Sequence, residues 1–255
     1  MIIWICIRET FSNGGFFLKL DSSLMNNIVD KYNKASEMSK SNLIQFQKPR
    51  ENYQIRQKLI DNDDINFGKM KQSLHKIATN ILFNTLDALH ISKDDQNKLF
   101  SGFDTKYFDS NFCMNLYLDA DEGDGVYLHK DFTYITILYP DYKVPGLADA
   151  NGNIITVPES CLLVFYGETL ELLTDHKINA LSHQVKKVEE DRLTMALFLT
   201  GPYKDEPSNN DLLNVPFLVT KHCDKGFGII QHNEYSLYKN FHENRLKKYY
   251  GDMKL

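Results

Sequence analysis

The chain has few cysteines and no long apolar run. These two features argue against a disulfide-rich protein and against a membrane-spanning one. Its 4 cysteines are widely spaced and include no Cys-x-x-Cys pair, which argues against a disulfide framework and favours a reducing compartment. Cys113 and Cys161 lie inside apolar runs and are expected to be small core residues. The apolar start, residues 1–7, is far shorter than the roughly 20 residues of a membrane span and lacks the basic start of a signal peptide. We therefore expect a short buried strand there, in a cytoplasmic protein without membrane contact.

The chain also lacks an excess of positive charge. Its 29 Lys and Arg residues are outnumbered by 34 Asp and Glu, which gives a net charge of −5. Because nucleic-acid-binding surfaces are normally basic, no nucleic-acid partner is expected. Aromatic residues are plentiful, with 14 Tyr and 16 Phe among 255 residues, whereas a disordered chain has few. We expect one globular domain over residues 1–255.

The pattern of apolar residues predicts helices in the first part of the chain. A strand pair around a turn at residues 12–15 precedes a helix from about 22 to 39. Residues 40–66 are weakly patterned and are expected to form a loop with a short helix. Residues 67–100 carry apolar residues at helical spacing, with a break near His90 and a further short helix after it.

From about residue 108 the pattern changes to many short strands. They are rich in aromatic and β-branched residues and are separated by turn signals. The expected strands are 111–118, 134–139, 154–157, 161–166, 180–187 and 192–199. Such spacing predicts a β-sandwich or barrel. The fold class is therefore α+β, with a helical N-terminal part over about 1–107, a β-rich core over about 108–202 and a tail over about 203–255 that ends in a helix near 233–250.

The first residues that suggest chemistry are His129-Lys130-Asp131. Alternate side chains of a strand face the same side, so His129 and Asp131 are expected to point into the core and Lys130 outward. An imidazole and a carboxylate that converge there bind a metal or form a plain hydrogen-bonded pair. The motif by itself is not specific, because residues 222–224 have the same His-x-Asp form.

A histidine in a strand-like run and an arginine that begins another strand follow the motif at residues 129–131. The motif at residues 222–224 is not followed by such a pair. His183 lies in a strand-like run about fifty residues further on, and Arg192 and Thr194 begin another strand. Two histidines and a carboxylate on one face of a metal form the facial triad of non-haem iron(II) oxygenases. A guanidinium with a hydroxyl beside it suits a bidentate carboxylate. Asn115 and Tyr117 are a third same-face pair, placed to hydrogen-bond a ligand near the metal.

The same residues have plainer interpretations. The His-x-Asp motif is then a buried pair and His183 an unrelated core residue, while His176 is a rival third ligand that no strand flanks. Arg192 would pair with an acidic side chain of residues 189–191 on the surface. Asn115 and Tyr117 would be core residues whose polar groups are hydrogen-bonded within the protein. Three aromatic residues are expected in the core rather than in a substrate pocket: Tyr134, Phe165 and Tyr166.

Taken in order, these segments resemble the isopenicillin N synthase-like branch of the iron(II)/2-oxoglutarate-dependent dioxygenases. The similar segments are residues 13–17 (GFF), Asn115-x-Tyr117 (N-x-Y), His129-x-Asp131-Phe132 (H-x-D-F), 146–158 (G-L-Q-V…V-P), 164–171 (V-x-x-G-D-x-L), His183 and Arg192-x-Thr194. The resemblance covers nearly the whole chain and is strongest over residues 111–202.

The resemblance implies a double-stranded β-helix, or jelly-roll, core with iron at its open end. The implied Fe(II) ligands are His129, Asp131 and His183. The implied contacts of 2-oxoglutarate are Arg192, Thr194, Asn115 and Tyr117. O₂ would drive decarboxylation of 2-oxoglutarate to succinate and CO₂, and a small-molecule substrate of secondary metabolism would be hydroxylated, desaturated or cyclised.

The chain departs from the pattern of this branch in several places. The gap from His183 to Arg192 is about two residues shorter than usual, so a tight hairpin is expected there. Thr194 stands where serine is commoner but keeps the hydroxyl, and Lys130 replaces a small residue. The chain also starts late relative to the branch, so the first strand of the branch is expected to be either altered or supplied by residues 1–7.

Two other functions fit the same residues. One is an iron oxidase of the same branch that works without 2-oxoglutarate and holds a substrate carboxylate on Arg192. The other is a non-catalytic metal-binding sensor or binding module, against which the intact triad argues. The pattern specifies neither the prime substrate nor the oligomeric state, because the pocket-forming segments are its least patterned parts.

Overall fold

The structure is a computed structural model. It describes residues 6–11, 14–40, 53–54, 67–93, 96, 110–119, 125–174, 176–200, 216–218 and 235–237.

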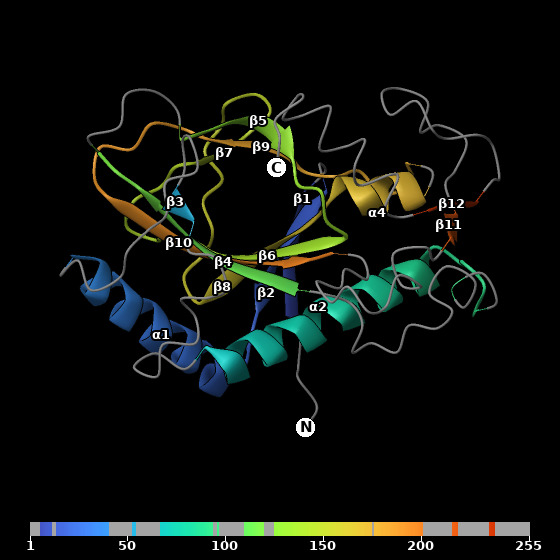
Figure 1. The fold of residues 1–255 in the computed structure, drawn as a ribbon, viewed down its shortest axis with the longest axis horizontal. Helices are drawn as coiled ribbons and strands as arrows, with labels where there is room; N and C mark the ends of the chain where they lie inside the picture. Colours follow the sequence, from blue (N-terminus) through green and yellow to red (C-terminus); the bar gives the residue numbers. More distant parts are fainter. Residues whose placement is uncertain are drawn as a thin grey trace.

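Among these residues, antiparallel strands form a large and a small sheet that face each other (Figure 1). The large sheet has seven strands in the order β1-β2-β8-β6-β10-β4-β3, and the small sheet has three in the order β5-β9-β7. The strands of the large sheet are β1 (Cys6–Phe11), β2 (Gly15–Lys19), β3 (Tyr53–Gln54), β4 (Ser110–Tyr117), β6 (Ile135–Tyr139), β8 (Cys161–Tyr166) and β10 (Arg192–Leu199). Those of the small sheet are β5 (Val126–Lys130), β7 (Leu147–Asp149) and β9 (Ser182–Val185).

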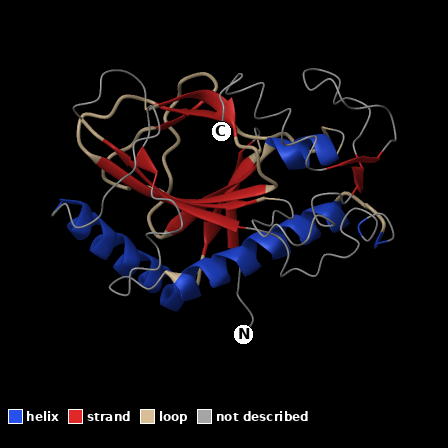
Figure 2. Ribbon diagram, viewed as in Figure 1, coloured by secondary structure: helices blue, strands red, loops and turns tan. Residues whose placement is uncertain are grey.

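Two long helices cover one side of the large sheet, and the small sheet lies on its other side (Figure 2). The two long helices are α1 (Ser22–Lys40) and α2 (Gly68–Ala88). A short helix, α4 (Glu168–Leu173), follows β8. Asp21 caps α1 by accepting a hydrogen bond from the Leu24 N–H. The end of α2 confirms the predicted break, since His90 just beyond it has a φ of 57°. None of the described helices combines the length and the apolar character needed to cross a membrane.

Alternate residues of the large sheet pack on its two faces, as the period of two in a strand requires. On β4, Phe112 and Met114 belong to the cluster against the helices, whereas Tyr117 belongs to the cluster between the sheets. β8 follows the same rule, with Leu162 on the helix side and Leu163 between the sheets. The space between the sheets is therefore lined by one set of alternating side chains, and the candidate site lies in that set.

The structure confirms strands in five of the predicted core segments and corrects the sixth. Residues 154–157 form no strand, and Ile154 makes a single isolated bridge. The small-sheet strand β7 lies earlier, at Leu147–Asp149. The carboxylate of Asp149 accepts hydrogen bonds from two backbone N–H groups of the following turn, and Pro158 has no N–H to extend a ladder.

The prediction for the C-terminal tail is wrong where the structure describes it. Within the predicted helix at 233–250, Tyr235–Leu237 forms strand β12, which pairs with β11 (Pro216–Leu218). In the predicted loop at 40–66, β3 adds a short strand beside β4. The rest of the tail, residues 1–5 and the second His-x-Asp motif lie outside the described residues, as does most of the short helix expected after His90.

The connection from His183 to Arg192 is not the tight hairpin that its length suggested. β9 and β10 lie in different sheets, where β9 pairs with β5 and β7, and β10 pairs with β4 and β6. Residues 186–191 therefore cross from the small sheet, which carries His183, to the large one, which carries Arg192.

Candidate active site

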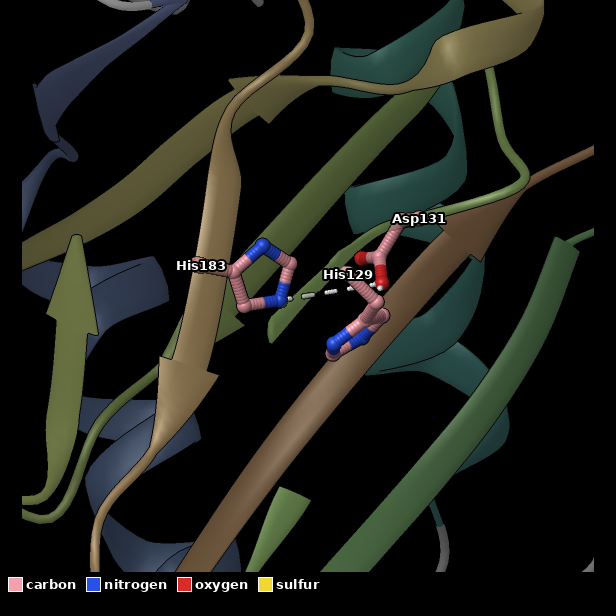
Figure 3. Close-up of side chains that lie close together, drawn as sticks. All are labelled: His129, Asp131 and His183. Atoms are coloured by element: carbon pink, nitrogen blue, oxygen red, sulfur yellow. Dashed lines mark ion pairs between the residues drawn. The ribbon is translucent and has the colours of Figure 1, made fainter. Parts of the chain in front are cut away.

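Strands β5 and β9 bring the two histidines together. His129 and His183 are direct partners in this antiparallel pair, with ring centroids 4.4 Å apart. Asp131 follows the end of β5, and its Oδ1 lies 3.3 Å from His129 Nε2 and 3.7 Å from His183 Nε2. The three side chains point toward one another (Figure 3), and one ligand atom from each lies within 4.8 Å of the others. Two nitrogens and a carboxylate oxygen arranged in this way fit the facial ligand set of non-haem iron(II).

Neighbouring groups orient these side chains. The backbone oxygen of Leu181 lies 3.1 Å from Nδ1 of His183, so a proton on Nδ1 leaves the Nε2 lone pair directed at Asp131. The hydroxyl of Thr136 donates to Oδ2 of Asp131 at 2.7 Å, which leaves Oδ1 toward the histidines. Thr133 extends this contact, with its Oγ1 3.0 Å from that of Thr136. The sequence did not single out these threonines, because a threonine a few residues after a candidate ligand is not by itself a sign of contact with it.

The protonation states of the cluster suit a cation. Burial lowers the pKa of the His183 imidazole, which favours its neutral, ligating form. Burial by itself would raise the pKa of the Asp131 carboxyl, but His183, the His129 contact and the Thr136 hydrogen bond hold it below its usual value. A neutral imidazole beside an ionised carboxylate is the state that metal binding requires.

The four residues expected around 2-oxoglutarate lie together on the large sheet. Strands β4 and β10 are antiparallel neighbours in which Arg192 is paired with Tyr117 and Thr194 with Asn115. Direct partners share a face, as do residues two apart, so all four side chains lie on the face between the sheets. Each is at most 8% exposed.

Arg192 is a buried cation in need of an anion. It is 2% exposed, its Nε donates to the Val144 backbone oxygen at 3.1 Å, and its guanidinium carbon lies 5.2 Å from the centroid of the Tyr117 ring. Within the described part of the chain no carboxylate makes an ion pair with it. Burial disfavours the charged form of the guanidinium and so lowers its pKa. Since an unpaired buried charge is costly, this guanidinium fits an anionic ligand. Asn115 Oδ1 is also buried and has no partner among these residues.

The surface ion pair considered for Arg192 is excluded by this burial. Of the neighbouring acidic residues, Asp191 accepts a hydrogen bond from the Asp119 N–H instead. Of the three aromatic residues expected in the core, Tyr134 and Tyr166 pack with the helix-side cluster. Phe165 is a core residue of the inner cluster, and its ring also lies edge-on to His183 at 4.9 Å.

Lys130 points away from the metal ligands, but it does not simply extend into solvent. Its Nζ lies 2.9 and 2.7 Å from the two carboxylate oxygens of Glu171 on α4, whose side chain is 6% exposed. The rival ligand His176 also faces this carboxylate, with Nδ1 3.7 Å from Oε1, and lies outside the His-Asp-His cluster. The sequence pattern gave no sign of this contact, because 41 residues separate Lys130 from Glu171.

Two facing antiparallel sheets, with a His-Asp-His cluster on the smaller one and a buried arginine on the larger one, are the arrangement expected of a jelly-roll oxygenase dependent on iron and an oxo acid. Residues 108–201 match the model of the 2OG-Fe(II) oxygenase superfamily. This stretch, the jelly-roll core, is therefore similar to the domain of that superfamily, and the chain is an oxidoreductase that uses Fe(II) and 2-oxoglutarate.

Solved structures agree with this assignment at the level of the fold. The rice dioxygenase for auxin oxidation has a TM-score of 0.60 at 16% identity, over 92% of this chain and 85% of that one. A full-length Neurospora crassa protein, solved with alpha-KG and 5-formyluracil, has a TM-score of 0.64 at 13% identity, over 92% and 86%. JOX2, solved with 2OG, Fe and JA, has a TM-score of 0.62 at 17% identity, over 92% and 77%. No curated protein matches the sequence. The jelly-roll fold is thus confirmed.

Proposed function

We propose that His129, Asp131 and His183 hold the iron of a 2-oxoglutarate-dependent oxygenase. The observation that supports this most directly is the His129–His183 cross-strand pair, with Asp131 Oδ1 3.3 and 3.7 Å from the two Nε2 atoms. When bound, iron(II) supplies the activation of O₂ that splits 2-oxoglutarate into succinate and CO₂. For a hydroxylation, one oxygen atom of O₂ would enter succinate and the other would be inserted into a C–H bond of the substrate to give R–OH.

In this proposal Arg192 and Thr194 bind the distal carboxylate of 2-oxoglutarate, and Asn115 and Tyr117 lie beside it. The support is the shared face of the four residues and the lack of an ion-pair partner for Arg192 in the described structure. A guanidinium held by its Nε still offers donors on its other nitrogens, which suit a planar carboxylate. Burial excludes water from this interaction and makes it stronger than an exposed pair.

We further propose that the prime substrate is a small organic molecule that is hydroxylated, desaturated or cyclised. Structural neighbours support this, since the Neurospora crassa protein was solved with 5-formyluracil and JOX2 with JA. The cytoplasmic location and the role in secondary metabolism stay predictions from the sequence.

The decisive test is an oxygen-free titration of apo-protein with Fe(II) and then 2-oxoglutarate. Iron-chelated 2-oxoglutarate has a weak visible charge-transfer band, which we expect in the wild type. His183→Ala should abolish the band and Arg192→Ala should weaken it. His176→Ala is the matched control for a histidine outside the cluster, and Lys177→Ala is the control for an exposed cation.

Each other outcome has a defined meaning. Iron binding without a band would point to the oxidase that works without 2-oxoglutarate. A normal band without O₂-dependent succinate, over a panel of small substrates, would point to a sensor. Full iron binding by His183→Ala would refute the ligand assignment.

A further inference from the structure

A single carboxylate, that of Asp141, lies behind Arg192 in the connection between β6 and β7. Its Oδ1 accepts hydrogen bonds from the N–H groups of Lys143 and Val144, at 3.0 and 3.2 Å. Its Oδ2 accepts a bond from the Leu193 N–H at 3.4 Å. Asp141 therefore fixes its own loop and ties that loop to β10 at the residue next to Arg192.

The same loop holds the guanidinium. The backbone oxygen of Val144, whose N–H is bound by Asp141, accepts the hydrogen bond from Arg192 Nε at 3.1 Å. The loop also packs against the stem of this arginine, because a Cβ added to Gly146 would lie 3.1 Å from Arg192 Cδ. The direction of the guanidinium thus follows the position of a loop that Asp141 closes.

Helix α1 completes the arrangement through Tyr32. Its hydroxyl donates to Asp141 Oδ2 at 2.9 Å and lies 3.1 Å from the Leu193 backbone oxygen. Burial, reinforced by the negative charge of Asp141, raises the pKa of this hydroxyl, so it stays a donor at all ordinary pH values. Tyr139 packs on the Tyr32 ring, with the two ring centroids 4.9 Å apart.

Asp141 also supplies charge without occupying the guanidinium. No ion pair between it and Arg192 is present, yet its negative charge favours the protonated arginine through space. A carboxylate in direct contact would compete with the ligand, whereas one held behind the backbone does not. Desolvation of the arginine is thereby partly offset while its binding face stays open.

We propose that Asp141 and Tyr32 are positioning residues that aim Arg192 at the distal carboxylate of 2-oxoglutarate. This rests on the proposed function of Arg192. Helix α1, which covers the opposite face of the large sheet, is thus connected to co-substrate binding by one chain of contacts: Tyr32, Asp141, Val144 and Arg192.

The test compares two oxo acids on the iron-loaded, oxygen-free protein: 2-oxoglutarate and 2-oxopentanoate, which has the same carbon chain but no distal carboxylate. Affinities are measured by calorimetry and by the charge-transfer band. We expect Asp141→Asn to raise the Kd of 2-oxoglutarate about tenfold and Tyr32→Phe about threefold. The Kd of 2-oxopentanoate and that of Fe(II) should stay at the wild-type values. Tyr166→Phe is the matched control, since it removes a tyrosine hydroxyl that faces Thr85 on α2, away from Arg192.

A double-mutant cycle separates positioning from general damage. In an Arg192→Ala background, Asp141→Asn should add little further loss, because the arginine that it positions is absent. Equal losses for both oxo acids, or full additivity with Arg192→Ala, would overturn the proposal, as would an unchanged Kd for 2-oxoglutarate in both single variants. If wild-type protein binds the two oxo acids equally well, the assignment of Arg192 itself fails, which is a different result. Tyr32→Phe keeps the test decisive if Asp141→Asn does not fold.

Discussion

The two halves of the candidate site are built differently. The half with the metal ligands lies on the three-stranded sheet and at a strand end, and the side chains of His129 and Asp131 are 28% and 10% exposed. The half expected to bind 2-oxoglutarate lies on two neighbouring strands of the seven-stranded sheet, and Arg192 and Thr194 are at most 2% exposed. A metal that must meet O₂ and substrate needs access, whereas a carboxylate anchor gains from exclusion of water. We therefore expect changes in the first half to affect binding more than folding, and changes in the second to affect both.

The largest expected effect is on the metal half. His183→Ala should lower iron affinity by more than about 100-fold, because loss of groups that merely orient a ligand already costs about 10- to 100-fold. Iron binding is measured by anaerobic equilibrium dialysis. His176→Ala, also near α4 but outside the cluster, should bind iron normally, and an equal loss in that variant would contradict the comparison.

The next prediction concerns Arg192, in the half of the site expected to bind 2-oxoglutarate. Here we expect stability and ligand binding to change differently. Arg192→Met keeps the stem and removes a buried charge, so the free energy of unfolding of the apo-protein should stay equal or rise by about 1 kcal/mol. The Kd of 2-oxoglutarate should rise on the order of 100-fold, since two charge-assisted hydrogen bonds are lost.

Denaturant unfolding and ligand-induced shifts in Tm measure both quantities for Arg192→Met. If the Arg192→Met apo-protein is less stable than the wild-type apo-protein, the partners of Arg192 within the protein already stabilise its charge, and no anionic ligand is needed to do so.

A smaller effect concerns the contact between the metal strand and α4. Lys130→Met leaves Glu171 buried without its cation, which should cost about 2 kcal/mol of unfolding free energy, less than a fully buried pair because Lys130 is 32% exposed. Lys130→Met combined with Glu171→Met should recover most of this loss. The exposed pair Lys93–Asp87 is the control, and Lys93→Met should change stability far less than Lys130→Met. Equal losses in the two lysine variants would show that the Glu171 contact has no special weight.

The smallest expected effect concerns Tyr139, on the side of the large sheet behind Arg192. Its effect on stability is small at neutral pH and grows at alkaline pH. Burial, with help from Asp141, raises the pKa of Tyr139 to about 12. A group whose pKa is higher in the folded state stabilises fully below its unfolded value near 10 and loses this contribution as pH rises toward 12. Unfolding measured from pH 9 to 12 should therefore show a loss of stability that Tyr139→Phe reduces.

The metal half should respond at the opposite end of the pH range. Burial lowers the pKa of His183, so the unfolded chain takes up the proton first and stability falls as pH drops below about 6.5. An acid limb of the same size in His183→Ala would contradict this origin.

The sequence by itself predicted the residues of the candidate site and, for four of them, the face of the sheet on which they lie. Strand alternation placed Arg192 with Thr194 and Asn115 with Tyr117, and the structure joins these pairs in one register. Their roles, and those of the three metal ligands, stay proposals. The predicted strand at 154–157 failed because a local apolar pattern does not record how a turn and a proline interrupt a ladder.

Only the tertiary structure decided which groups support the site. Glu171 beside Lys130 and Asp141 behind Arg192 come from parts of the chain that are distant in sequence. The same holds for the path from β9 to β10, which crosses between sheets instead of turning back. Periodicity reports how each segment divides its side chains between two faces, but partners distant in sequence are fixed by sheet order and packing, which no local pattern contains.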